Sequence, residues 1–318
     1  MKTTPIASSA LPGTSGIDPR TRTLLRRADI LINRKLDGIL HGEYQGLVPG
    51  HGSERGETRK YQPGDDVRHI DWNVTARLDD TYIRETIADR ELSTWAAVDL
   101  SPSLDFGTAQ RDKRELALLA LTAIGFLTAR TGNRFGAVLA NGADLTVVPA
   151  RSGRSHLLTL LHTAAALQTP KVPQARTDLA ASLTRLGALH RRRGLAIVIS
   201  DFLAPAGWQS ALGQLSVRHE TLAIEVLDPR ELELPDVGLL TLVDPETGRR
   251  REVQTSGASL RARYSAAATQ QRADIASAIR IGGADHLHLR TDRDWVDDLV
   301  RFVKLRRERA SRLPRRTR

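Results

Sequence analysis

The chain has 318 residues, 40% of them hydrophobic and 26% charged, which fits a globular protein with a sizeable core and excludes disordered and fibrous classes. It contains no cysteine, so disulfides, thiolate metal sites and cysteine nucleophiles are excluded. The formal net charge is +10, but residues 301–318 hold nine basic residues and one acidic residue, so the other 300 residues carry only +2.

The first 93 residues are predicted to contain a leader, a helix and a β-rich segment. Residues 1–19 are rich in Ser, Thr, Pro and Gly and are expected to be a flexible leader without a secretory signal. Apolar residues recur at three- and four-residue spacing over 20–40, which predicts an amphipathic helix. Glycines and turn signals then indicate loop-rich β structure up to residue 93, with Trp72 as a core anchor.

Strands alternate with helices from residue 94 to residue 300. This alternation predicts right-handed crossovers and an α/β fold with a doubly wound, mostly parallel sheet of five or six strands. No apolar run is long enough to span a bilayer, so a cytoplasmic protein is expected. The expected strands are 94–100, 134–140, 145–148, 195–200, 220–227, 239–243, 250–254 and 285–289. The expected helices are 111–131, 154–167, 178–191, 208–216, 259–281 and one from 294 into a basic tail at 301–318.

Two loops that follow apolar strands carry hard oxygen ligands. The first expected strand of this region runs into Asp99, Ser101 and Ser103, and the strand at 195–200 runs into Asp201. Ligands of open α/β sheets bind beyond the carboxyl ends of the strands, so these side chains converge if their strands are neighbours. Mg²⁺ prefers such oxygen ligands and is commonly held by one or two carboxylates. A Mg²⁺ site is therefore one interpretation, and a helix-capping turn is the alternative.

The pattern Asp-x-Ser-x-Ser followed by a later Asp resembles the metal-ion-dependent adhesion site of von Willebrand factor type A domains. The resemblance implies a further threonine ligand, for which Thr177 is the best match. It also implies that the hydroxyls bind Mg²⁺ or Mn²⁺ directly, and that an acidic side chain of a partner completes the shell. The implied metal ligands are Asp99, Ser101, Ser103, Thr177 and Asp201.

The segment before this site narrows the resemblance. Residues 59–77, which read RKYQPGDDVRHIDWNVTAR, and the following Arg84-Glu85 are similar to the signature of the bacterial family called domain of unknown function fifty-eight. Proteins of that family carry a type A-like domain after this signature and are typically encoded beside MoxR-type AAA+ ATPases. The resemblance implies a non-enzymatic adaptor that works with such an ATPase or with its client in protein assembly or remodelling.

Other functions are weighed against this one. The basic tail leaves open a nucleic-acid-associated protein, although the tail has no aromatic residue after Phe302 for base stacking. A Mg²⁺-dependent hydrolase lacks an evident general base. No Walker A motif is present, so ATP binding by this chain is not expected. His286 and His288 share one face of a short strand, but no carboxylate pattern lies nearby, so an ordinary strand is expected there.

Overall fold

The computed structural model describes most of the chain from residue 58 to residue 312. The predicted leader, the predicted helix at 20–40 and residues 41–57 of the predicted β-rich segment lie outside the described residues. The described residues are 58–62, 67, 70–78, 80–84, 93–109, 111–130, 132–142, 144–167, 177–245 and 247–312.

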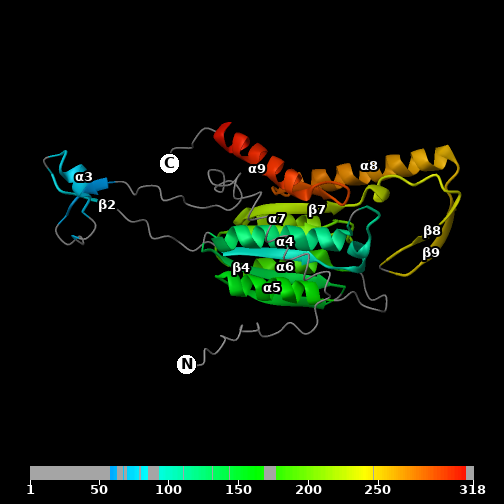
Figure 1. Cartoon of the computed structure of the whole chain (residues 1–318), viewed down its shortest axis with the longest axis horizontal. Helices are drawn as coiled ribbons and strands as arrows, with labels where there is room; N and C mark the ends of the chain where they lie inside the picture. Colours follow the sequence, from blue (N-terminus) through cyan, green and yellow to red (C-terminus); the bar gives the residue numbers. More distant parts are fainter. Residues whose placement is uncertain are drawn as a thin grey trace, which may run out of the picture.

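The centre of the molecule is a six-stranded sheet with the order β10-β7-β6-β3-β4-β5 (Figure 1). Neighbouring strands are parallel except for β4 and β5, which form an antiparallel hairpin. The predicted doubly wound, mostly parallel sheet is therefore confirmed. The strands are β3 (Ser93–Asp99), β4 (Arg134–Asn141), β5 (Asp144–Arg151), β6 (Leu195–Ser200), β7 (Glu220–Leu227) and β10 (Asp285–Arg290).

Helices cover both faces of this sheet, because its inner strands are apolar on both sides. Successive residues of β3 point to opposite faces, so Ala96 and Val98 join one core cluster while Trp95 and Ala97 join the other. The first cluster is completed by α4 (Lys113–Arg130), α5 (Arg154–Ala166) and α9 (Trp295–Arg312). The second is completed by α6 (Leu179–Leu189), α7 (Trp208–Arg218) and α8 (Ala258–Ile281).

A small β unit precedes the sheet in the chain. It pairs β1 (Thr58–Lys60) with β2 (Tyr82–Arg84) and includes the short helix α3 (Trp72–Thr75). Asp71 caps α3 by accepting hydrogen bonds from the backbone N–H groups of Asn73 and Val74. The prediction that Trp72 is a core anchor is wrong: the residue is 70% exposed, because it lies in the single turn of α3, none of whose residues is buried.

A second hairpin lies between β7 and α8 in the chain and projects beyond one end of the sheet, at the right of Figure 1. It is formed by β8 (Leu239–Val243) and β9 (Arg250–Gln254), and it follows the 3₁₀ turn η5 (Pro229–Glu231). After β10, helix α9 continues to Arg312, so the first part of the predicted basic tail is helical. Within the described ranges, the helices lack the combination of length and apolarity that crossing a membrane requires.

Candidate functional site

The two loops with the predicted oxygen ligands lie side by side. β3 and β6 are adjacent parallel strands, so Asp99 at the end of β3 and Asp201 just after β6 emerge at the same edge of the sheet. The chain continues from β3 to β4 on one side and from β6 to β7 on the other, which makes this edge the point where the strand order reverses. Such a point is where open α/β sheets bind ligands.

The carboxylate of Asp99 is buried without a positive partner. Its Oδ1 accepts a hydrogen bond from the backbone N–H of Ser101 at 3.0 Å, and its Oδ2 accepts one from the hydroxyl of Ser200 at 2.8 Å. Burial and the nearby charge of Asp201 nevertheless raise the pKa of Asp99 to about 6. Among the described residues no cation pairs with this carboxylate, so none of them neutralises its negative charge.

Three hydroxyls accompany the carboxylates. The 3₁₀ turn η4 (Pro102–Asp105) begins directly after Ser101. The Oγ of Ser101 lies 2.9 Å from the Oγ of Ser103. Thr177 lies just before α6, where Asp178 caps the helix and fixes the entry of the chain. The threonine is 4% exposed, and its Oγ1 is buried without a hydrogen-bond partner. A buried hydroxyl without a partner is costly, which is a reason to expect a ligand at this point.

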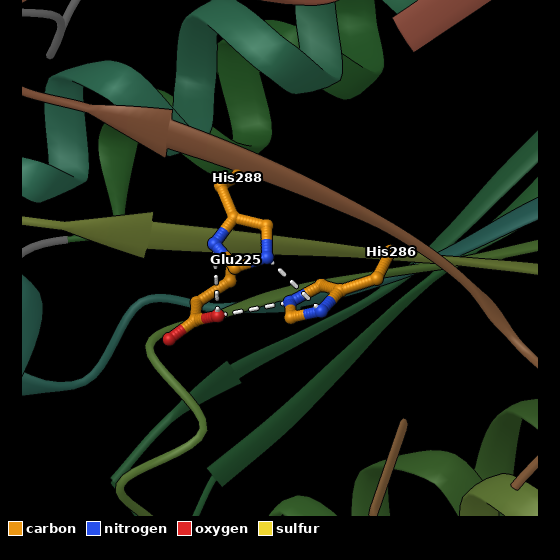
Figure 2. A group of neighbouring side chains, drawn as sticks. All are labelled: Glu225, His286 and His288. Carbon is orange, nitrogen blue, oxygen red and sulfur yellow. Dashed lines mark hydrogen bonds and ion pairs between the residues drawn. The ribbon is translucent and has the colours of Figure 1, made fainter. Parts of the chain in front are cut away.

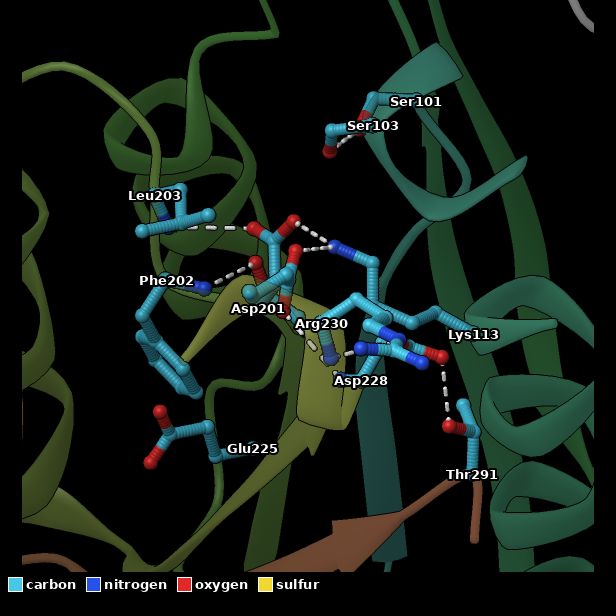
Figure 3. Close-up of polar contacts among 12 residues, drawn as sticks. Ser101, Ser103, Lys113, Asp201, Phe202, Leu203, Glu225, Asp228, Arg230 and Thr291 are labelled. Atoms are coloured by element: carbon cyan, nitrogen blue, oxygen red, sulfur yellow. Dashed lines mark hydrogen bonds and ion pairs between the residues drawn. The ribbon is translucent and has the colours of Figure 1, made fainter. Parts of the chain in front are cut away.

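Asp201 differs from Asp99 because it is paired with a buried lysine. The ammonium of Lys113, at the start of α4, lies 2.8 Å from Oδ2 of Asp201 (Figure 3) and also contacts Glu231. Burial alone would raise the pKa of Asp201, but the charge and hydrogen bond of Lys113, together with hydrogen bonds from Leu203 and Ser103, outweigh burial and lower it. For Lys113 itself, the attraction of the two carboxylates outweighs burial and raises its pKa. This half of the edge therefore carries its own cation.

The network of ion pairs and hydrogen bonds around Lys113 extends to residues that the sequence did not identify. Arg272 of α8 donates to Glu231 at 3.0 Å, to Glu225 at 2.9 Å and to the backbone carbonyl of Asp201 at 2.9 Å. A sequence signal for Lys113 exists, since it lies three and four residues before buried Leu116 and Ala117 on the core face of α4. Glu231 lies in an Asp-x-x-Glu capping box that begins at Asp228, whereas no such pattern marks Arg272.

A third aspartate at this edge is structural. Asp228, just after β7, is fully buried and accepts hydrogen bonds from the backbone and hydroxyl of Thr108, from the hydroxyl of Thr291 and from the backbone of Arg230. Figure 3 shows its contacts with Arg230 and Thr291. Because the chain supplies all these donors, Asp228 ties together three loops and has little capacity left for a ligand.

All five predicted ligand residues line one cavity of about 630 Å³. The hairpin β8–β9 contributes to the same cavity, so the cavity combines the carboxylates of the sheet edge with guanidinium groups and apolar side chains. The basic lining residues are Lys113, Arg230, Arg249, Arg250, Arg251 and Arg272, and the large apolar ones include Phe106, Leu203, Leu234, Leu242 and Val243. Such a cavity suits a ligand that is itself acidic and partly apolar.

The residues of this edge fit a divalent cation. The 2.9 Å between the hydroxyl oxygens of Ser101 and Ser103 equals the separation of adjacent ligands about 2.1 Å from Mg²⁺ in an octahedron. The unpartnered Oγ1 of Thr177 offers a third neutral oxygen, and Asp99 offers a negative charge that no cation among the described residues compensates. Lys113 reduces the negative charge near Asp201, so Asp99 would be the principal anionic group for the ion.

Comparison with known proteins agrees with the signature in the sequence. A family model described as protein of unknown function DUF58 matches residues 57–274, which is more than half of the chain. The chain belongs to the DUF58 family. The DUF58 chain is 53% identical over 294 residues to uncharacterized protein Rv1480 of Mycobacterium tuberculosis, and the match covers 92% of each protein.

Solved structures similar to this DUF58 protein are more distant. An aerotolerance-related membrane protein from Bacteroides fragilis is 13% identical, with a TM-score of 0.45, and the match covers 69% of this chain and 99% of that chain. The SpRpn10 VWA domain is 11% identical, with a TM-score of 0.35, over 66% of this chain and 94% of that chain. The fold assignment of the DUF58 protein rests on its own strand order.

Proposed function

We propose that this DUF58 protein is a non-catalytic binding module that holds an acidic group of a partner protein through a Mg²⁺-type ion at the edge of its sheet. The observation that carries the proposal is the set of oxygen ligands around Asp99. Among the described residues, Thr177 Oγ1 has no hydrogen-bond partner and Asp99 has no cation, yet both are buried in the same cavity. A divalent cation would supply both missing interactions, and Mn²⁺ would fit the same ligands.

The rest of the cavity supports an acidic partner. A metal held by only two or three neutral oxygens and Asp99 keeps net positive charge and can accept a carboxylate from another molecule. The neighbouring guanidinium groups of Arg249, Arg250 and Arg251 add positive charge around the same cavity. Leu242 and Val243 of β8 are 36% and 54% exposed and can contact apolar groups beside that carboxylate.

By resemblance to the family, the partner is a MoxR-type AAA+ ATPase or a client that it remodels, in the cytoplasm. The proposal assigns no ATP binding to this chain, so the ATPase would supply the energy for remodelling. This chain would supply the docking site, and the metal would make docking dependent on the ion.

Partner capture tests the proposal. The full chain is titrated with a nucleotide-free MoxR-type ATPase from the same genome, by anisotropy, in Mg²⁺ and in EDTA. We expect binding in Mg²⁺ that is lost in EDTA and in Asp99→Asn, because that variant removes the charge that holds the ion. Asp292→Asn is the matched control, since Asp292 pairs with Arg290 outside the cavity. Binding that stays as strong in EDTA and in Asp99→Asn as it is for the wild type in Mg²⁺ would contradict the metal-dependent mechanism.

The alternative is a nucleic-acid-associated protein that acts through its basic C-terminus. Deleting residues 301–318 would be a poor test, because Val303 is buried and Arg306 pairs with Glu220 and Asp285. Removing residues 313–318 eliminates Arg315, Arg316 and Arg318 and leaves α9 intact. The alternative predicts salt-sensitive DNA or RNA binding that this truncation weakens, whereas the binding-module proposal predicts unchanged partner capture.

A further inference from the structure

A second group of metal-ligating side chains lies on strands β7 and β10. His286 and His288 are two residues apart in β10 and therefore point to the same face of the sheet. Glu225 of β7 is the direct neighbour of His288 in the parallel register, so its carboxylate reaches the same face. The sequence did not reveal this carboxylate because it lies 61 residues before His286. Figure 2 shows the three side chains converging between the two strands.

The distances within this group suit a shared ion. Oε2 of Glu225 lies 2.8 Å from Nε2 of His286 and 3.6 Å from Nδ1 of His288. Ligands about 2.0 to 2.1 Å from a tetrahedral Zn²⁺ lie about 3.3 Å apart, between these two values. One ligand atom from each residue lies within 4.8 Å of the others. The imidazoles already contact each other, Nε2 of His288 being 3.1 Å from Nδ1 of His286, so Nε2 of His286 and Nδ1 of His288 are left to face the carboxylate.

The carboxylate is held in place from behind. Oε1 of Glu225 accepts a hydrogen bond from Arg272 at 2.9 Å, which leaves Oε2 directed at the histidines. An outer partner of this kind fixes the orientation of a metal ligand. The side chain of Glu225 is 1% exposed, that of His286 is 13% exposed and that of His288 is 52% exposed. The group is therefore anchored on its buried side and open to solvent on the side of His288.

We infer that Glu225, His286 and His288 form a second metal site, for a divalent transition metal of the Zn²⁺ class. Two imidazole nitrogens and one carboxylate oxygen are the ligand set that suits such ions, whereas Mg²⁺ prefers oxygen ligands alone. Three protein ligands leave one position for water or for a group of another molecule at the open side. The site is distinct from the Asp99 edge in both ligand type and position, so it does not depend on the proposed function.

Zinc titration of the full chain tests the inference. Zn²⁺ is added against a chromophoric chelator in excess Mg²⁺, so that oxygen sites are already filled. The variant is His288→Gln, whose exposed position lets the chain fold, as circular dichroism would verify. The matched control is His156→Gln, which removes an imidazole on α5 that contacts the backbone carbonyl of Phe135.

We expect the affinity for the most tightly bound Zn²⁺ ion to fall at least about tenfold in His288→Gln. Loss of a side chain that only orients a metal ligand already causes a loss of about this size, and His288 would be a ligand itself. His156→Gln and Asp99→Asn should bind this equivalent as the wild type does. Co²⁺ should give the visible absorption of a tetrahedral nitrogen–oxygen site in the wild type, and His288→Gln should lose it. Equal Zn²⁺ affinity and stoichiometry in the wild type and His288→Gln would overturn the inference.

Discussion

Asp99 and Asp201 lie at the ends of neighbouring strands at the same edge of the sheet, yet their electrostatic surroundings are opposite. Lys113 neutralises Asp201 and lowers its pKa, whereas Asp99 receives only neutral hydrogen bonds and its pKa rises to about 6. In the part of the chain that the structure describes, Asp201 thus has a cationic partner and Asp99 has none. The comparison locates the expected cation on the Asp99 side, beside Ser101, Ser103 and Thr177.

Removing the internal cation should have the largest effect on this comparison. Lys113→Met leaves Asp201 buried without its cationic partner and removes one of the two cationic partners of Glu231. Loss of one partner from a buried ion pair costs about 3 to 5 kcal/mol, so we expect the free energy of unfolding at neutral pH to fall by that order. Urea denaturation measures this change in the free energy of unfolding.

Lys304→Met is the control for Lys113→Met, because Lys304 is exposed on α9. A surface change of this kind should alter the free energy of unfolding by less than about 0.5 kcal/mol. Saturating Mg²⁺ should restore more stability to Lys113→Met than it adds to the wild type, since the ion would replace the lost positive charge. A loss below about 1 kcal/mol in Lys113→Met would show that Asp201 does not depend on the lysine.

Acidification should weaken metal binding through Asp99. Below a pKa of about 6 the carboxyl group is protonated, and the ion must displace that proton. We expect the Mg²⁺ association constant to be nearly constant above pH 7 and to fall about tenfold for each pH unit well below 6. Calorimetry at several pH values measures this, and in Asp99→Asn the residual binding should lose the dependence. An unchanged affinity down to pH 5 would contradict the role of Asp99.

The smallest effect on stability is expected at the unpartnered hydroxyl. Thr177→Val keeps the shape of the side chain and removes an Oγ1 that makes no hydrogen bond. The free energy of unfolding without metal should therefore stay within about 0.5 kcal/mol or increase, because no hydrogen bond is lost and a buried polar atom is removed. Mg²⁺ affinity should nevertheless fall. Thr184→Val is the control, since its hydroxyl bonds to Ala180 within α6.

The outcome for Thr177→Val separates a ligand from a merely buried residue. A loss of stability together with unchanged Mg²⁺ affinity would mean that the hydroxyl has a structural role. Unchanged stability with weakened Mg²⁺ binding would assign it to the ion.

The fold was largely predictable, because buried strands and amphipathic helices leave periodic patterns in the sequence. The strands at 195–200, 220–227, 239–243 and 250–254 were predicted with the bounds that the structure shows, whereas β5 extends three residues past its predicted end. That extension crosses a register shift opposite Phe135, which an apolar run does not reveal. The prediction for Trp72 was wrong because it relied on the usual burial of aromatic residues, which a single-turn helix does not guarantee.

The candidate site was only half predictable. Asp99, Ser101, Ser103 and Asp201 follow strands directly, so strand order alone brings them together. Their electrostatic differences come from Lys113, Glu231 and Arg272, which lie on other elements and reach the edge through tertiary packing. The same is true of Glu225, whose place beside His288 follows from the pairing of β7 with β10.

The most direct test of the central claim is a Mg²⁺ titration by calorimetry of the full chain and of Asp99→Asn at pH 7.5. Asp99→Asn is preferable to Asp201→Ala, because removing Asp201 would also take from Lys113 one of its two carboxylate partners. The account predicts one Mg²⁺ per wild-type chain and an affinity at least about tenfold weaker in Asp99→Asn, as expected when a metal ligand loses its charge. Absence of Mg²⁺ binding by the wild type at millimolar concentration, or equal binding by both proteins, would contradict it.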